Sequence, residues 1–164
     1  MFDLVISSGT IYSSGNSFVG DIGITGETIA EIKEGGGLEG KSTIDATGKL
    51  VFPGFIDPHV HIHLPFMGTN AIDDHESATK AALVGGTTTI IEMICPGPDD
   101  EPANAFAEWR GLAEKGCCCD YTFHLAVVRF DELAKQQLRE LVANEGVQSF
   151  KIFLAYKGAL DISD

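Results

Sequence analysis

Short apolar segments separated by glycine and serine characterise the chain up to about Val51. They are rich in β-branched and aromatic residues and show no helical period: FDLVI (2–6), FVGDIGI (18–24), TIAEIKE (28–34) and KLVF (49–52). Gly26-Glu27 separates two of them by the length of a hairpin turn, and a GGG run follows at 35–37. This pattern predicts an all-β first part, residues 1–51.

From Phe52 onward, strand patterns alternate with helix patterns. The predicted strands are 54–62, 87–94, 120–128 and 147–156, and the predicted helices are 73–86, 104–116 and 130–146. Asp73 or Asp74 is expected to cap the first helix, which ends near Gly85. Strands that alternate with helices predict an α/β fold with a parallel sheet and right-handed crossovers over residues 52–164.

Two architectures fit this alternation, an open doubly wound sheet and a (β/α)8 TIM barrel. No strand is followed by a glycine-rich phosphate-binding fingerprint, so nucleotide binding has little support. In a barrel the chemistry lies at the carboxyl ends of the strands, and polar residues collect at those positions here.

Composition excludes several classes of partner. The 164-residue chain has 24 acidic and 11 basic residues and a formal net charge of −13, which argues against nucleic acid and anionic membranes. Met1 leads directly into a strand pattern without a basic leader, and no apolar run is long enough to span a bilayer. Cysteine usage fits a reducing cytoplasm, because Cys95 stands alone and Cys117, Cys118 and Cys119 are adjacent. The three adjacent cysteines are interpreted as small apolar residues rather than as a zinc knuckle.

Candidate chemistry begins at the end of the first predicted strand of the α/β part. Alternate residues of a strand share one side, so Asp57, His59 and His61 point the same way, and two such histidines can bind one metal ion. Lys151 stands in an apolar run where a charged amine is costly to bury. A neutral amine can react with carbon dioxide to give a carbamate that bridges two metal ions. An ion pair of Lys151 with Glu92 or Asp57 is the alternative that spacing alone favours.

Four ordered motifs carry a resemblance to a known family. They are 45-DATGKLVFPGFIDPHVHIHLPFMGT-69, 87-TTTIIEM-93, 120-DYTFHLAV-127 and 149-SFKIFLAYK-157. On these motifs the chain, over essentially its whole length, resembles the dihydropyrimidinase/D-hydantoinase family of the metal-dependent amidohydrolase superfamily. The similarity is strongest to the bacterial hydantoinases.

The resemblance implies the first half of a (β/α)8 barrel, preceded by part of a small β-sandwich domain. It implies two Zn2+ ions, hydrolysis of the cyclic amide bond of dihydropyrimidines or 5-substituted hydantoins, and a cytoplasmic homotetramer. The site residues that it implies are His59 and His61 as zinc ligands, Lys151 as a carboxylated lysine bridging both ions, Tyr156 on the substrate carbonyl, and Leu64, Phe66 and Phe153 around the substrate side chain. Asp57 matches a structural acid rather than a catalytic one.

Several features depart from the family pattern. The family takes two further histidines and a proton-transferring aspartate from later barrel strands, whereas this chain stops at Asp164. We therefore expect the chain alone to be catalytically silent and to associate through open apolar edges. His75 is expected at the surface of the first helix, His124 as a core histidine, and His63 as a loop residue without a metal.

Other members of the superfamily and a different class remain as alternatives. Allantoinase and dihydroorotase are related cyclic amidohydrolases, but the arginine that follows His-x-His in dihydroorotases is absent here. A non-enzymatic scaffold of the collapsin-response-mediator type would have lost metal ligands, whereas His59, His61 and Lys151 are all present. An inactive fragment is the last alternative.

Overall fold

The computed structural model describes residues 1–66, 68–158 and 160–162, apart from the side chain of Phe66. Two compact units make up the chain, Met1–Pro53 and Gly54–Asp164.

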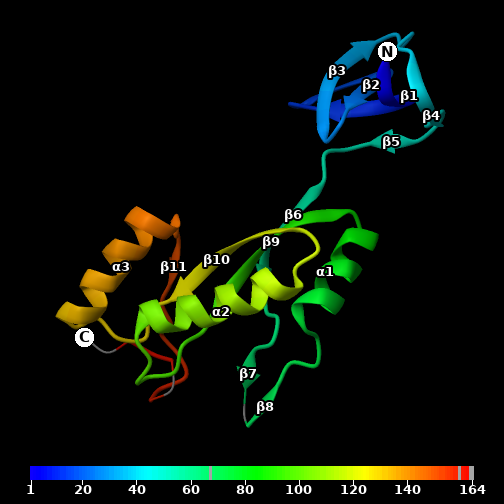
Figure 1. Ribbon diagram of the computed structural model, residues 1–164. Coiled ribbons are helices and arrows are strands. Elements are labelled where there is room, and N and C mark those ends of the chain that lie inside the picture. The colour runs from blue at the N-terminus through cyan, green and yellow to red at the C-terminus, as the bar shows by residue number, and fades with distance from the viewer. Residues whose placement is uncertain (67, 159, 163–164) are drawn as a thin grey trace. The chain divides into compact units, whose positions relative to one another are not determined.

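The first unit is a single mixed sheet (Figure 1). Its strands are β1 (Phe2–Ser13), β2 (Asn16–Thr25), β3 (Thr28–Glu34), β4 (Gly40–Asp45) and β5 (Leu50–Val51), in the order β3-β2-β1-β4, and β5 also pairs with β1. The antiparallel β2–β3 pairing opposes Thr25 to Thr28, which confirms the hairpin at Gly26-Glu27. Strand β4 was not predicted, because its sequence GKSTID contains a single apolar residue. It forms because β1 offers it a parallel partner edge.

A buried carboxylate organises the glycine run of this unit. Asp21 is 4% exposed, and its carboxylate accepts the backbone N–H groups of Ser8, Gly37 and Leu38 at 2.9, 2.8 and 3.0 Å. Gly36 has φ +74°, and a Cβ at that position would stand 2.9 Å from the Asp21 carboxylate. The loop therefore requires glycine, for its backbone conformation and for the close approach of Asp21.

The second unit contains a four-stranded parallel sheet with three helices (Figure 1). The order is β11 (Phe150–Lys151), β10 (Asp120–Ala126), β9 (Thr87–Ile94) and β6 (Phe55–Val60), and every pairing is parallel. A short antiparallel hairpin, β7 (Pro65–Phe66) with β8 (Thr69–Asn70), follows β6. The prediction of an α/β unit with a parallel sheet is confirmed.

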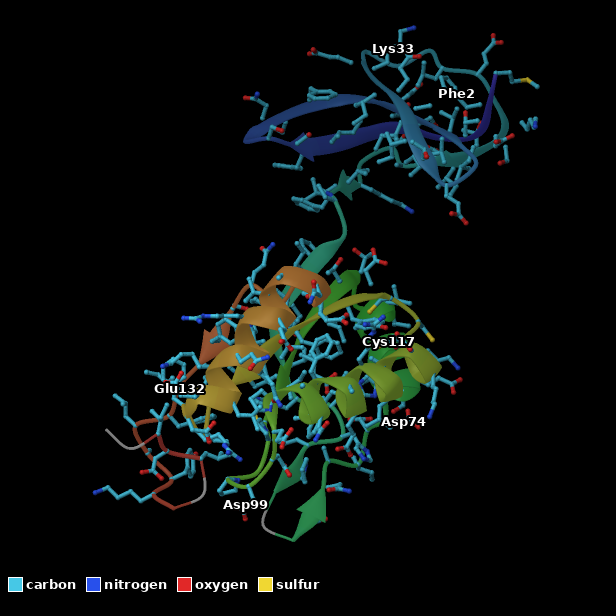
Figure 2. The ribbon with its side chains drawn as sticks, turned by 60° about the vertical axis from the view of Figure 1, so that its left-hand side comes forward. Phe2, Lys33, Asp74, Asp99, Cys117 and Glu132 are labelled. Atoms are coloured by element: carbon cyan, nitrogen blue, oxygen red, sulfur yellow. The ribbon has the colours of Figure 1, made fainter. Side chains whose placement is uncertain are left out.

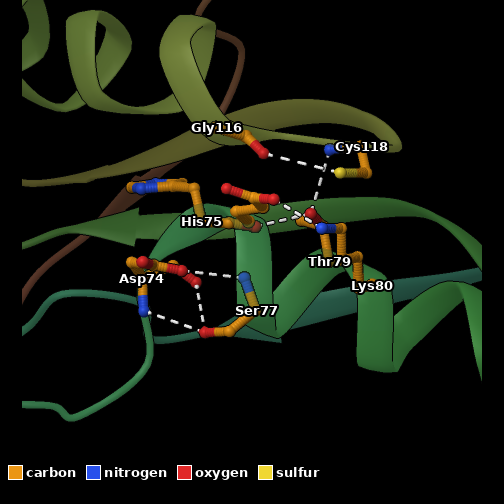
Figure 3. Close-up of polar contacts among 8 residues, drawn as sticks. Asp74, His75, Ser77, Thr79, Lys80, Gly116 and Cys118 are labelled. Carbon is orange, nitrogen blue, oxygen red and sulfur yellow. Dashed lines mark hydrogen bonds and ion pairs between the residues drawn. The ribbon is translucent and has the colours of Figure 1, made fainter.

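The helices begin and end close to the predicted residues. They are α1 (His75–Val84), α2 (Pro102–Gly116) and α3 (Glu132–Glu145), and Figure 2 labels Asp74, Cys117 and Glu132 at their boundaries. Asp74 caps α1 through a reciprocal pair of hydrogen bonds with Ser77 (Figure 3), and Gly146 ends α3 with φ +71°. Within the described ranges, none of the helices is long and apolar enough to span a bilayer.

A continuous apolar core joins α2 and α3 to β9 and β10. Ile94 and Leu125 on the sheet are fully buried, and Phe106 and Trp109 of α2 are each 6% exposed. The Phe106 and Phe123 rings meet edge to face at 5.7 Å. This packing fixes the two central strands, and residues directly after β9 line the candidate site.

The prediction of a long buried strand at 147–156 is wrong. Only Phe150 and Lys151 pair with β10, while Ile152 and Leu154 are 59% and 87% exposed. Within the described residues β11 lies at the edge of the sheet and pairs on one side only. An apolar run is buried only where neighbouring elements cover it, and no described element covers Ile152 and Leu154.

Candidate active site

Two histidine side chains converge at the carboxyl end of β6. The Nε2 atoms of His59 and His61 lie 3.0 Å apart, and the rings are inclined at 62°. Alternation along the strand directs both rings to one side, as the sequence predicted. The pKa of His61 is lowered, first by desolvation and then by the nearby His59 and Lys151. A lowered pKa favours the neutral imidazole, which is the form that binds a metal ion.

Two carboxylates hold the backbone that carries these histidines. The Asp57 carboxylate accepts the His59 N–H at 3.1 Å, which agrees with a structural role for this acid. The Glu92 carboxylate, on β9, accepts the Ile62 N–H at 3.3 Å.

Several of the predicted site residues share one cavity of about 310 Å³ at the ends of β9 and β11. The predicted site residues that line it are His61, Leu64, Lys151, Phe153 and Tyr156. Cys95 also lines the cavity. The side chain of Phe66 lies outside the described residues. A larger groove of about 700 Å³ between α3 and β11 is mainly apolar and has no histidine, cysteine or acid in its lining. The smaller cavity is therefore the better candidate for chemistry.

Lys151 makes no ion pair within the part of the chain that the structure describes. Its Nζ lies 4.6 Å from the centroid of the Phe153 ring. Glu92 and Asp57, the two acids considered as its partners, bond instead to His75 and to the His59 backbone. The ion-pair alternative for Lys151 is therefore not what the geometry supports.

Tyr156 adopts an unusual backbone conformation beside the cavity. Its φ is +62°, and its ring meets the Phe153 ring edge to face at 5.9 Å. Positive φ is rare for a bulky residue, and such outliers concentrate at functional sites. The phenol is 56% exposed and is accessible to a ligand.

The expectation that His75 lies at the surface is wrong. It is 4% exposed, and its Nε2 lies 2.7 Å from the carboxylate of Glu92, which is 1% exposed. Burial raises the pKa of Glu92, and the bond to His75 opposes that rise. A charged residue inside the apolar run TTTIIEMI was the signal for a buried partner, but the sequence did not identify that partner as His75.

His124 and the cysteines behave as structural residues. His124 is half-buried and hydrogen-bonds through its two ring nitrogens to Ser149 and to the Pro58 carbonyl. Burial raises the pKa of Cys117 to about 12, so its thiol is not activated.

Comparison with known proteins shows similarity to dihydropyrimidinases and hydantoinases over nearly the whole chain. No protein-family model matches the chain. The chain is 37% identical over 166 residues to the dihydropyrimidinase of Rattus norvegicus, covering 98% of this chain and 32% of the relative. It is 38% identical over 160 residues to the D-hydantoinase of Geobacillus stearothermophilus, covering 98% of this chain and 34% of the relative. The solved D-hydantoinase of Thermus sp. superimposes with a TM-score of 0.90 at 51% identity, over 98% of this chain and 35% of that one.

The chain is homologous over nearly its whole length to the dihydropyrimidinase/D-hydantoinase family. It spans about a third of the length of the relatives that it matches.

The described residues contribute few side chains that could bind a metal ion. Among the described residues, no group of three or more His, Cys, Asp and Glu side chains could hold a metal ion. The nitrogen donors near the cavity are the imidazoles of His59 and His61 and the amine of Lys151. Two converging imidazoles fit zinc, and a complete zinc site needs further ligands in addition.

Proposed function

We propose that this chain supplies part of the active site of a zinc-dependent cyclic amidohydrolase. Its substrates would be the ring amides of dihydropyrimidines or 5-substituted hydantoins. The observation that carries the proposal is the 3.0 Å approach of the His59 and His61 Nε2 atoms, next to a cavity that His61 shares with Lys151. Homology to proteins named dihydropyrimidinase and D-hydantoinase supports the substrate class.

The chain's own residues would supply some of the ligands of two zinc ions, and further parts of the enzyme would supply the rest. His59 and His61 would bind one ion through Nε2. Lys151 would react as the neutral amine with carbon dioxide, forming an N–C bond and releasing a proton, and the resulting carbamate would bridge both ions. The absence of an ion pair at Lys151 among the described residues supports this role, because no carboxylate there engages the amine. Bound zinc lowers the pKa of a coordinated water and polarises the substrate carbonyl.

Tyr156 and the apolar residues of the cavity would bind the substrate. The Tyr156 hydroxyl would donate a hydrogen bond to the ring carbonyl oxygen, on which negative charge develops during attack. Leu64 and Phe153 would form the wall against the ring substituent. We assign Phe66 to the same wall, although its side chain lies outside the described residues.

We further propose the architecture and setting that the family resemblance implies. Residues 1–51 would form part of a β-sandwich domain, and residues 52–164 the first four βα units of a (β/α)8 barrel. A homotetramer in the cytoplasm is the proposed assembly. Free cysteines and the exposed apolar side chains of Phe150 and Ile152 support a reducing compartment and association with a further protein surface.

A chimera tests the proposed function directly. This chain would replace the matching third of the Thermus sp. D-hydantoinase, to which it is 51% identical. We expect the chimera to bind zinc and to hydrolyse dihydrouracil and a 5-arylhydantoin, and we expect His59→Ala to lose both properties. The matched control is His124→Asn, which alters a histidine without a proposed metal role.

Two results would contradict the proposal. One is a folded chimera whose His59→Ala variant keeps its full zinc content and turnover. The other is hydrolysis of allantoin without hydrolysis of either proposed substrate, which would favour the allantoinase alternative.

A further inference from the structure

A buried pair of titratable side chains lies next to the candidate site without a role in the proposed chemistry. Glu92 of β9 and His75 of α1 are 1% and 4% exposed, and the carboxylate and the ring Nε2 lie 2.7 Å apart. Burying two such groups costs free energy that their mutual attraction often does not recover. The burial of Glu92 and His75 at this position therefore requires an explanation other than a gain in stability.

The second oxygen of Glu92 connects the pair to the metal-binding segment. It accepts the N–H of Ile62, the residue directly after His61, at 3.3 Å. The β6–β9 ladder is irregular between Asp57 and Val60, and its last pairing opposes Val60 to Glu92. Beyond that point Ile62, which is 4% exposed, lies outside the ladder, and the Glu92 carboxylate supplies the acceptor that its N–H requires.

The segment from His59 to Ile62 is consequently held at both ends. Asp57 accepts the N–H of His59 at 3.1 Å, and Glu92 accepts that of Ile62. Both carboxylates act on the backbone, so neither occupies a ring nitrogen of His59 or His61.

His75 is itself held firmly at the start of α1. The Thr79 hydroxyl donates to the His75 carbonyl oxygen and accepts the N–H of Cys118 at 2.9 Å (Figure 3). Gly116 approaches so closely that a Cβ there would stand 3.0 Å from the His75 Cβ. The helix start is thus tied to the loop before β10, and His75 presents a fixed partner to Glu92.

We propose that the His75–Glu92 pair positions the zinc-binding end of β6, by holding the Ile62 N–H and with it the backbone of His61. This inference rests on the proposed function, because it assigns His59 and His61 to zinc. Glu92 and His75 are positioning residues and do not touch the metal.

Three variants test the proposal, each made in the 164-residue chain for amide exchange and in the chimera described above for zinc binding. The double variant Glu92→Leu/His75→Phe removes the acceptor for Ile62, and replacement of a buried ion pair by apolar residues of similar volume often leaves stability unchanged. Glu92→Gln keeps a side-chain oxygen for the Ile62 N–H. Leu138→Ala is the matched control, because it weakens the core of the same unit from α3.

Two measurements apply to each variant. Amide hydrogen exchange of Ile62, relative to that of Leu125 in β10, is followed by NMR without metal, and the zinc dissociation constant is measured by competition with a chelator. In the double variant we expect Ile62 exchange to accelerate about tenfold or more and zinc to bind about 10- to 100-fold more weakly. Glu92→Gln should remain close to wild type in both, and Leu138→Ala should leave the Ile62/Leu125 ratio and the zinc affinity unchanged.

The outcomes separate this inference from the proposed function. Unchanged Ile62 exchange in the double variant overturns the inference, and so does unchanged zinc affinity despite faster exchange. A wild-type chimera that binds no zinc would contradict the proposed metal site. The exchange of Ile62 would then decide by itself whether Glu92 holds this backbone.

Discussion

Replacing Lys151 by methionine separates its two possible roles, because they predict different losses. The variant keeps the length of the apolar stem and removes the amine. Among the described residues the amine makes no ion pair, and it lies 4.6 Å from the centroid of the Phe153 ring. Such a cation–π contact contributes about 0.5–1 kcal/mol at an exposed site. We therefore expect Lys151→Met to lower the free energy of unfolding by at most about 1 kcal/mol.

The ion-pair alternative predicts a much larger effect. Removing one partner of a buried ion pair leaves an uncompensated charge and costs about 3–5 kcal/mol. If Lys151 bridges zinc ions, zinc binding should be lost while stability is nearly retained. In Lys151→Ala, short-chain carboxylic acids should partly restore zinc binding by occupying the space of the carbamate.

Urea unfolding and metal analysis measure these two quantities on the same sample. Trp109, the single tryptophan of the chain, is buried in the second unit and reports its unfolding by fluorescence. Zinc content is measured after dialysis against zinc and bicarbonate. Lys157→Met is the matched control, because that lysine is exposed in the same region and should change neither quantity. A loss of about 3 kcal/mol or more in Lys151→Met, or retention of its full zinc content, would refute the bridging role.

Two further predictions concern residues outside the zinc-binding set. Asp21→Asn should lower the free energy of unfolding of the first unit by about 2–3 kcal/mol. The amide NH2 group of asparagine would face a backbone N–H group, so one buried charge-assisted hydrogen bond would be lost. Hydrogen bonds from Ser8 and Leu38 lower the pKa of Asp21 below its ordinary 3.8, so its stabilisation is complete above that pH and is lost as the pH falls through the lower native pKa. Urea unfolding followed by the amide signals of the first unit, at about pH 7 and about pH 3, should show a larger loss of stability on acidification in wild type than in the variant, in which Asp3 and Asp45 still titrate. His63→Asn should leave the zinc content unchanged, because asparagine tolerates the φ of +52° at this position and His63 does not line the cavity; loss of zinc would show that His63 is a ligand.

Local sequence patterns determined most of the secondary structure. Asp74 caps α1, and Gly146 ends α3 in the left-handed conformation, as the pattern of cap residues predicts. Strand β9 coincides with the predicted 87–94. These features depend on neighbours within a few residues, so the sequence contains the interactions that decide them. The convergence of His59 and His61 belongs to the same class, because strand alternation alone places them on one side.

Contacts between segments that are distant in the sequence decided the remaining features of the structure. Strand β4 exists because β1 pairs with it, and the run after Lys151 is exposed because no described element covers it. Glu92 was recognisable as a buried charge, but its choice of His75 over Lys151 depends on which segments the parallel sheet and α1 bring together. The hydrophobic pattern specifies which side chains are buried, but it does not specify which polar groups come into contact when they are buried. For that physical reason the sequence by itself identified the candidate zinc ligands, and only the tertiary structure revealed the buried pair that holds their backbone.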